Sequence, residues 1–440
     1  MLIDKLKLAL PNWLLNFARW SLAHLSKLHF FVKASFVQTL LNARIRKIRR
    51  NSNRPINVAF LVVYDMVFQF KHVFELMKKD ASFVPQIIII PDVSRGQTNM
   101  KNQMDHSFIA LNKKYPGDVI RADSSADGTF VDLSNKYDIF FLMNPYSAMT
   151  HRFYTFAYLA RKGQLIVYTH YAVGEGTANS KHFDQLKEMQ YLWRFYLERP
   201  SEYIRFKKSQ PILSLFHRLS VVGAVKTDLL GCQKVQTRNR NRIILAPHHS
   251  VPKNNTPLSI GNFNRYASFF LNLPERYPNI DWVFRPHPLL FWTMINLGYW
   301  TASDAENYMK KMMSYSNVEY QTSSDYHEAF VNSDALIQDS GSFIAEYHLT
   351  GHPQCYLLRD DKILETQFNT FGRKMLKHTY KAYSENQITH FIDTVVVKGQ
   401  DNMKSSRMDF VEKELKVNFL HASEAIITDI KNELLNSHEA

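Results

Sequence analysis

The sequence predicts an α/β protein built on two parallel β-sheets. Near-continuous apolar runs recur along the chain from residue 56 onward, and helical patterning separates most of them. An apolar run without alternation is typical of a strand that is buried on both faces, as strands of a parallel sheet are. A polar, basic stretch at residues 233–242 then separates one such series from a second. Two series of strands that alternate with helices indicate two doubly wound domains.

The predicted strands divide between these two domains. Those of the first domain are the runs at residues 56–64, 83–90, 138–143, 164–169 and 220–225. Those of the second domain are the runs at residues 243–246, 281–284, 318–320, 335–338 and 354–358. Two Rossmann-like domains in tandem, with a cleft between them, form the GT-B architecture of many nucleotide-sugar enzymes, so we predict a GT-B fold.

The chain divides into four parts on this interpretation. They are an N-terminal segment at residues 1–54, an acceptor-side domain at 55–232, a nucleotide-donor domain at 233–400 and a C-terminal helix at 401–440. A chain of 440 residues, of which 45% are hydrophobic, is long enough to bury two cores. The two cysteines lack metal-type spacing, so we expect a reducing, cytoplasmic compartment and neither a disulfide framework nor a zinc site.

Most of the positive charge belongs to the N-terminal segment. The chain carries a net charge of +14, and residues 1–54 alone hold eleven Lys or Arg and one acidic residue. Leucine, phenylalanine and tryptophan are interspersed with these cations, as in basic amphipathic helices that lie on an anionic membrane leaflet. No uninterrupted apolar stretch reaches the roughly 18 residues that a membrane-spanning helix needs.

We therefore predict N-terminal amphipathic helices and a peripheral position on the inner face of the cell membrane. The alternative is a helical hairpin that packs on the first domain and leaves a solvated basic edge. Because the remainder of the chain carries little excess charge, nucleic acid is not an expected partner.

Two familiar nucleotide-binding loops are missing from the sequence. The first predicted strand is not followed by Gly-x-Gly-x-x-Gly, which argues against NAD or FAD as a cofactor. No Gly-Lys-Ser/Thr loop occurs either. We therefore expect no cofactor and place nucleotide binding in the second domain.

Two segments of the second domain have the residue types of a diphosphate site. An apolar strand ends at Asp339, and Ser340, Gly341 and Ser342 then open a helix, whose free N–H groups would face a phosphate. The alternative is an ordinary helix cap. Another strand ends in Arg285-Pro-His-Pro, where a cation could stabilise a departing nucleotide phosphate; a structural turn is the alternative here.

Four further residues are candidates by position. His170 follows a strand of the first domain and would act as a general base toward an acceptor hydroxyl, with His287 as the second catalytic histidine. His248 and His249 follow the first strand of the second domain; they are alternative candidates for the general base and also suit donor-phosphate binding. Glu346 lies in the helix after Ser342 and could reach a ribose or glycerol hydroxyl, or could be an ordinary exposed residue. We expect no metal, because the sequence has no Asp-x-Asp pair.

The chain between about residues 165 and 360 resembles the CDP-glycerol glycerophosphotransferase family, the teichoic-acid-polymerase-like enzymes. The similar segments are 169–170, 222–228, 243–247, 285–288, 334–346 and 351–353. The resemblance implies a GT-B transferase that moves glycerol phosphate, or a related polyol phosphate, from CDP-glycerol to a hydroxyl of a cell-envelope glycan or lipid-linked acceptor. It implies CMP as the released product and His170 and His287 as the catalytic pair.

Two alternatives remain open at this point. One is a GT-B glycosyltransferase that uses a UDP- or CMP-sugar for capsule or lipopolysaccharide synthesis. The other is a UDP-N-acetylglucosamine 2-epimerase-like isomerase, because the Asp-Ser-Gly-Gly-x-x-x-Glu segment of that enzyme is similar to residues 339–346. The turn that opens the epimerase after its first strand has no counterpart at residues 63–66, which argues against the second alternative.

Overall fold

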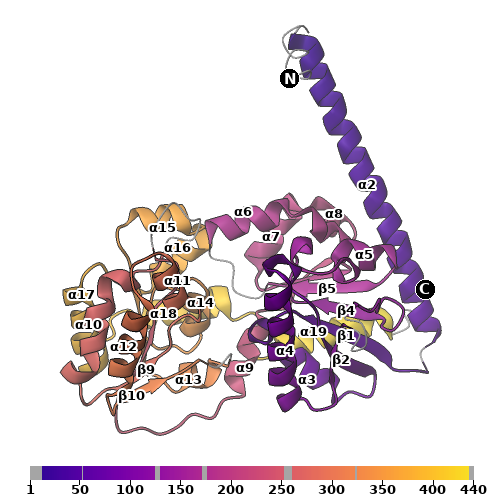
Figure 1. Ribbon diagram of the computed structural model, residues 1–440. Coiled ribbons are helices and arrows are strands. Elements are labelled where there is room, and N and C mark those ends of the chain that lie inside the picture. The colour runs from indigo at the N-terminus through magenta and orange to yellow at the C-terminus, as the bar shows by residue number, and fades with distance from the viewer. Residues whose placement is uncertain are drawn as a thin grey trace.

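The computed structural model describes residues 12–51, 53–123, 129–170, 176–251, 260–322 and 325–435. Figure 1 shows two α/β lobes side by side, with a long helix rising from one of them. Each lobe is built on one sheet, and all the strand pairings are parallel. The predicted α/β class with two parallel sheets is therefore confirmed.

The first domain contains a seven-stranded sheet in the order β3-β2-β1-β4-β5-β6-β7. Its strands are β1 (Ile56–Val62), β2 (Phe83–Ile89), β3 (Val119–Arg121), β4 (Ile139–Leu142), β5 (Leu165–Thr169), β6 (Arg194–Leu197) and β7 (Leu219–Val221). The sequence analysis did not find β3 and β6, which are short and contain an arginine. The apolar runs it did find lie in the core, where Phe60 of β1 stacks on Phe141 of β4 at 4.6 Å between ring centroids.

The second domain contains a six-stranded sheet in the order β10-β9-β8-β11-β12-β13. Its strands are β8 (Arg242–Ala246), β9 (Asp281–Phe284), β10 (Val318–Tyr320), β11 (Ala335–Gln338), β12 (Gln354–Leu357) and β13 (Tyr380–Ala382). Only β13 was not predicted. The strand order reverses beside β8, so the carboxyl ends of β8, β9 and β11 meet at a topological switch point, where open α/β sheets bind ligands.

Short helices connect the strands of both sheets. The first domain has α3 (Lys71–Met77), α4 (Gln97–Lys114), α5 (Phe156–Arg161), α6 (Thr177–Gln185), α7 (Pro200–Ser209), α8 (Pro211–Leu215) and α9 (Asp228–Gly231). The second has α10 (Phe263–Arg276), α11 (Leu290–Asn296), α12 (Ala302–Met313), α13 (His327–Val331), α14 (Ser342–His348), α15 (Lys362–Gln367), α16 (Thr370–Leu376), α17 (Glu385–His390) and α18 (Lys404–Phe410).

Short 3-10 helices and two π-helices, η7 and η8, complete the connections. They are η1 (Asp65–Val67), η2 (Val93–Arg95), η3 (Ser147–Met149), η4 (Arg152–Tyr154), η5 (Lys187–Tyr191), η6 (Val225–Thr227), η7 (Phe391–Val397) and η8 (Val411–Leu415). The predicted domain boundary after residue 232 lies in the segment between α9 and β8, the first place where the chain passes from one sheet to the other.

The N-terminal segment is one long helix, α2 (Asn12–Arg50), over residues 12–50. Its second half packs on the first domain, where Val37, Leu41, Ile45 and Ile48 are buried in the core. Figure 1 shows the first half rising away from that domain. Among the described residues, therefore, the helical hairpin considered as an alternative does not form. None of the described helices combines the length and the apolar character needed to cross a membrane.

The C-terminal segment differs from the single helix that the sequence predicts. Helix α18 and π-helix η8 pack on the second domain, and residues 416–421 then return to the first domain. There α19 (Ala422–Leu434) buries Ile426 and Ile430 in the first core. The interruption coincides with Asn418 and Leu420, whose φ angles of 44° and 66° are incompatible with a continuous right-handed helix.

Candidate functional site

The two domains touch through residues that follow strands or begin helices at the facing sheet edges. Lys226, after β7, forms an ion pair with Glu346, after β11, with 3.4 Å between Nζ and Oε1. The guanidinium carbon of Arg199, after β6, lies 3.5 Å from the centroid of the Phe371 ring. A pocket of about 120 Å³ is lined by residues of both domains, including Lys226 and Asp325. The carboxyl edges of both sheets are therefore brought together.

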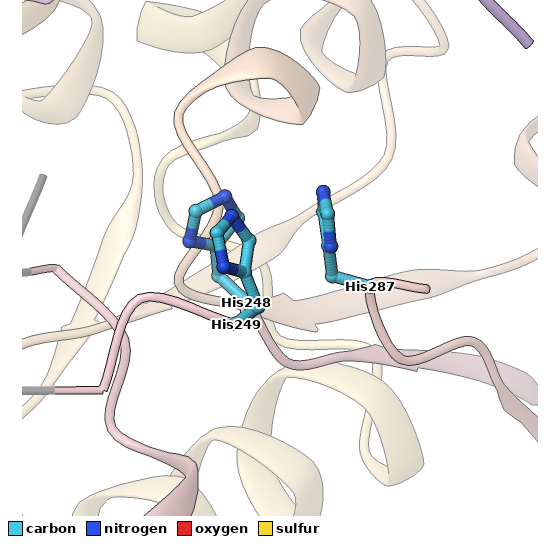
Figure 2. A group of neighbouring side chains, drawn as sticks. All are labelled: His248, His249 and His287. Carbon is cyan, nitrogen blue, oxygen red and sulfur yellow. The ribbon is translucent and has the colours of Figure 1, made fainter. Parts of the chain in front are cut away.

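Three histidines gather at the carboxyl ends of β8 and β9. His248 and His249 follow β8, and His287 follows the adjacent parallel strand β9. The ring centroids lie 4.5 Å apart for His248 and His249, 5.1 Å for His248 and His287, and 4.2 Å for His249 and His287. Figure 2 shows the first two rings beside each other, with the His287 ring facing them. The structure thus brings together three histidines that the sequence had placed at two separate strand ends.

The spacing of the three rings would suit a metal ion, because one ligand nitrogen from each lies within 4.8 Å of the others. Their hydrogen bonds favour a different ligand. The backbone amide of Ser250 donates to Nδ1 of His248 at 3.2 Å, and that of Leu289 donates to Nδ1 of His287 at 3.1 Å. A neutral ring whose Nδ1 accepts a hydrogen bond carries its proton on Nε2. The free nitrogens of these two rings are therefore donors, which suit the oxygens of a phosphate.

Burial keeps these three rings neutral in the absence of a ligand. It lowers the pKa of His287 to about 4, and His249 contributes to that shift. Burial, together with the neighbouring histidines, also holds the pKa of His248 well below its usual range. The pKa of His249 is lowered by burial as well. An anion among the rings would favour their charged forms, so it would be bound together with protons.

Arg285 lies two residues before His287, where β9 ends. Its Nη1 donates to Oε1 of Gln321 at 3.2 Å, and its guanidinium lies 5.6 Å from the centroid of the Tyr326 ring. Burial lowers the pKa of Arg285, but a guanidinium keeps its charge at any physiological pH. The strand end that precedes His287 therefore also carries a permanent cation, which contacts Gln321 and Tyr326.

Asp339 anchors the turn that carries His248. Its buried carboxylate accepts a hydrogen bond from the backbone amide of His248 at 2.7 Å and another from the backbone amide of Asn262. Burial raises the pKa of Asp339 to about 6, although these hydrogen bonds oppose the shift. Asp339 thus has a structural partner on each oxygen and orients the histidine cluster rather than joining it.

The small residues after Asp339 open α14, as the sequence analysis expected. The hydroxyls of Ser340 and Ser342 lie 3.2 Å apart, and neither caps the helix. Gly341 has an ordinary helical φ of −69°. A glycine here is therefore not needed for backbone conformation, and what it provides is room for close approach.

Glu346 takes a position that the sequence did not predict. Its carboxylate is buried, accepts a hydrogen bond from the hydroxyl of Tyr326 and pairs with Lys226 across the domain boundary. Both oxygens are therefore occupied by protein groups. The expected contact with a ribose or glycerol hydroxyl is replaced by a contact that joins the two domains.

His170 follows β5 and lies inside an aromatic enclosure. Its ring centroid is 4.3 Å from that of Phe183, 5.2 Å from Phe195 and 5.8 Å from Phe206. Only 6% of the residue is exposed, and its Nε2 has no hydrogen-bond partner among the described residues. Burial lowers its pKa to about 4. The structure thus does not join His170 to the histidine cluster of the other domain in the described part of the chain.

No known protein family and no curated protein matches the sequence. Solved structures do match the fold. The wall teichoic acid polymerase TagF aligns with a TM-score of 0.57 at 13% identity, over 96% of this chain and 99% of that one. UDP-GlcNAc 2-epimerase from Neisseria meningitidis aligns with a TM-score of 0.52 at 13% identity, over 86% of this chain and 99% of that one. S. aureus MnaA, solved with UDP, aligns with a TM-score of 0.51 at 11% identity, over 86% of this chain and 97% of that one.

The chain has the GT-B fold. The alignments span nearly the whole length of these neighbours, and this chain has the two parallel-sheet domains of that fold. Within a GT-B molecule, the histidine cluster lies at the switch point of the second sheet, at the edge that faces the first domain.

A buried group in the GT-B interface was missed by the sequence analysis. Glu198 follows β6, and its Oε2 accepts a hydrogen bond from Nη1 of Arg199 at 3.1 Å. Burial and the charge of Glu202 raise the pKa of Glu198 to about 8, against the influence of Arg199. The Glu198 carboxyl is therefore easier to protonate than that of an exposed glutamate. Its signal in the sequence is a Glu-Arg pair at a strand end, which went unnoticed because β6 itself was not predicted.

Proposed function

We propose that the protein is a transferase that moves glycerol phosphate, or a related polyol phosphate, from a CDP-activated donor to an acceptor hydroxyl. The observation that carries this proposal is the cluster of His248, His249 and His287 beside Arg285. Four side chains there can offer N–H groups or positive charge to a diphosphate at a switch point. The fold shared with TagF and the resemblance at residues 285–288 and 334–346 support the donor class.

The reaction joins the acceptor oxygen to the phosphorus next to the polyol. The bond between that phosphorus and the bridging oxygen of CMP breaks, and CMP leaves with the electron pair. In this proposal Arg285 and His287 stabilise the negative charge that develops on the departing phosphate, and Ser340 to Ser342 bind the diphosphate from the α14 side. The hydroxyl proton passes to a general base.

In this proposal the general base is His170, as predicted from the sequence. Its unpaired Nε2 is available for a proton, while the rings of Phe183, Phe195 and Phe206 enclose it. An acceptor hydroxyl reaches this nitrogen only if the aromatic enclosure opens. Substitution of His170 by Gln therefore tests both the role and the opening.

The acceptor and the location belong to the same proposal. We infer that the acceptor is a lipid-linked or polymeric envelope glycan and that the protein works on the inner face of the cell membrane. The support is α2, which carries most of the basic residues of the segment 1–54 and leaves Phe31, Val32 and Phe36 exposed. Over the full length of α2 the apolar and basic residues are not segregated onto opposite faces, so the amphipathic pattern predicted from the sequence is not found and the support is the charge of α2 together with these exposed apolar side chains.

A donor panel tests the proposed chemistry. The purified protein and membranes would be given CDP-glycerol, CDP-ribitol, CMP-sialic acid and UDP-N-acetylglucosamine, with the released nucleotides separated by chromatography. We expect CMP from a CDP-polyol alone. CMP from CMP-sialic acid or UDP from the sugar nucleotide would instead establish a glycosyltransferase, and conversion of UDP-N-acetylglucosamine to its epimer without nucleotide release would establish the isomerase.

The His287→Gln variant tests the role of the cluster in the same assay. We expect turnover to fall on the order of 100-fold, because one preorganised donor to the leaving group is lost. His390→Gln is the matched control, since that histidine is exposed at the end of α17 in the same domain. Equal turnover of the two variants would remove His287 from the mechanism.

A further inference from the structure

A second polar pocket lies in the first domain, apart from the histidine cluster. Its volume is about 610 Å³, and it is formed by η3, η4 and α5. The residues that line it are polar or basic: Ser147, Thr150, Arg152, Thr155, Tyr158, Arg161 and Lys162. The lining combines three cations with three aliphatic hydroxyls and includes no acidic side chain. This composition suits an anion that carries several oxygen acceptors.

No ion pair neutralises the three cations within the described part of the chain, although Lys162 interacts electrostatically with Asp132. Arg152, Arg161 and Lys162 form no ion pair with any described residue; Arg152 and Lys162 instead lie 5.0 and 5.6 Å from the ring centroids of Phe153 and Tyr158. The neighbouring acid Asp132 does not line the pocket and already accepts hydrogen bonds from the Tyr158 hydroxyl and the Ser134 amide. The positive charge of the pocket is therefore available to a ligand.

One hydroxyl of the lining also lacks a partner. Oγ1 of Thr150 is buried and makes no hydrogen bond within the described part of the chain. A buried hydroxyl without a partner costs free energy, so such groups usually face a bound water, ion or ligand. Because this oxygen is enclosed by protein atoms, an occupant of the pocket could bond to it only after the lining moves, so the case for an anion rests on the charge of the pocket.

The place of the pocket indicates where that occupant comes from. Helix α5, which supplies two of the lining residues and whose cap residues Thr155 and Lys162 supply two more, packs against α2. Just beyond the packed part of α2, the side chains of Phe31, Val32 and Phe36 are exposed. Figure 1 shows α2 passing α5 and continuing outward from the domain. A membrane that receives the apolar side chains of α2 would also present its head groups on this side of the domain.

We infer that this pocket binds the phosphate head group of a membrane lipid. Guanidinium groups bind phosphate oxygens in a bidentate manner, and an ammonium and hydroxyls complete the coordination. The inference rests on the proposed membrane association and not on the identity of the nucleotide donor. A soluble phosphomonoester has the same chemistry, so the experiment must distinguish the two sources.

Vesicle co-sedimentation of the full-length protein tests the inference. Phosphatidylcholine vesicles would be compared with vesicles that also contain phosphatidic acid or phosphatidylglycerol, for the wild type and for the double variant Arg152→Ala/Arg161→Ala. Both arginines are exposed, so the variant is expected to fold, and thermal unfolding checks that it does. We expect the variant to bind anionic vesicles about tenfold or more weakly, since each cation near the surface contributes.

The control removes the same charge elsewhere. Lys310→Ala/Lys311→Ala changes two exposed cations on α12 of the second domain, and its vesicle binding should stay within about twofold of the wild type. If both double variants bind vesicles like the wild type, or both weaken equally, the pocket is not a lipid site.

Glycerol 3-phosphate and inorganic phosphate provide the last arm. If either binds the wild type at micromolar concentration and displaces it from vesicles, the natural occupant is a soluble phosphate compound, which overturns the lipid assignment. Nucleotide release from the donor panel is measured on the same variants. Unchanged release with weakened vesicle binding would support the lipid pocket whether or not the donor is CDP-glycerol.

Discussion

At the scale of single residues, Gly223 shows a position that tolerates no side chain. It follows β7 with a φ of 97°, in the region that L-residues rarely adopt. A Cβ atom there would overlap the carbonyl oxygen of Val417 and lie 3.2 Å from Cβ of Ala422. The returning C-terminal segment therefore packs directly on this glycine, and the two chain crossings between the domains meet here.

We expect Gly223→Ala to destabilise the first domain through this overlap. Gly298 supplies the control, because its φ of 71° is similar and a Cβ there would meet nothing within 4 Å. Gly298→Ala should lose roughly 1–2 kcal/mol from backbone strain, and Gly223→Ala roughly 1–3 kcal/mol more from overpacking. Urea unfolding followed by circular dichroism would measure both. If the two variants lose the same unfolding free energy, the segment at Val417 moves aside at no energetic cost and the overlap does not destabilise the protein.

At the scale of elements, the paired ends of β8 and β9 form a site whose protonation depends on its ligand. Nucleotide binding there should take up protons, because an anion raises the pKa of rings that burial holds near 4 in His287. Affinity then falls as the pH rises through the raised pKa of the complex. In the free protein, the lowered histidine pKa makes folding stability depend on pH. The contribution of the neutral rings is fully present above about pH 6.5 and is lost as the pH falls toward the lowered pKa.

The affinity for CDP should therefore increase between about pH 7.5 and pH 5.5, by about tenfold per pH unit for each proton taken up. Isothermal titration calorimetry in buffers of different ionisation enthalpy would count those protons directly. The His287→Asn variant should take up fewer protons than the wild type. Binding that is independent of pH in both proteins would place the phosphates away from the histidines.

At the scale of the whole molecule, a buried ion pair couples the two domains. Glu346 of α14 contacts Lys226 and the hydroxyl of Tyr326, and Lys226 lies 5.1 Å from the centroid of the Tyr326 ring. This arrangement holds α14 against the first domain. It also places Tyr326 between Lys226 and Arg285, so the interface and the proposed donor site share a residue.

Substitution of Glu346 by Ala should weaken this coupling. The Tyr326 hydroxyl would lose its acceptor and Lys226 its partner, at a cost of roughly 2–4 kcal/mol in unfolding free energy. Glu346→Gln keeps an acceptor for the hydroxyl and should lose less. Differential scanning calorimetry would show the loss as a lower unfolding temperature. If Ala and Gln at this position are equally stable, the hydrogen bond from Tyr326 contributes nothing.

The sequence predicted the frame of the molecule because buried parallel strands leave an apolar signature that needs no tertiary information. Runs such as residues 56–64 and 335–338 were recognisable for that reason. The strands β3, β6 and β13 were not, since each has at most four residues and contains a lysine or arginine. Because β6 was not predicted, Glu198 at its end was not recognised as a candidate. The break in the C-terminal helix near Asn418 was not predicted either, because no glycine or proline stands there.

The sequence by itself determined the α/β class, the two domains and the candidates at strand ends, because these follow from local periodicity and from the residues that end each strand. Only the tertiary structure decided which strand ends are neighbours. It paired β8 with β9 and so joined His248 and His249 to His287, while it enclosed His170 among phenylalanines and turned Glu346 toward Lys226. Strand order and domain packing arise from contacts distant in sequence, and no local pattern records them.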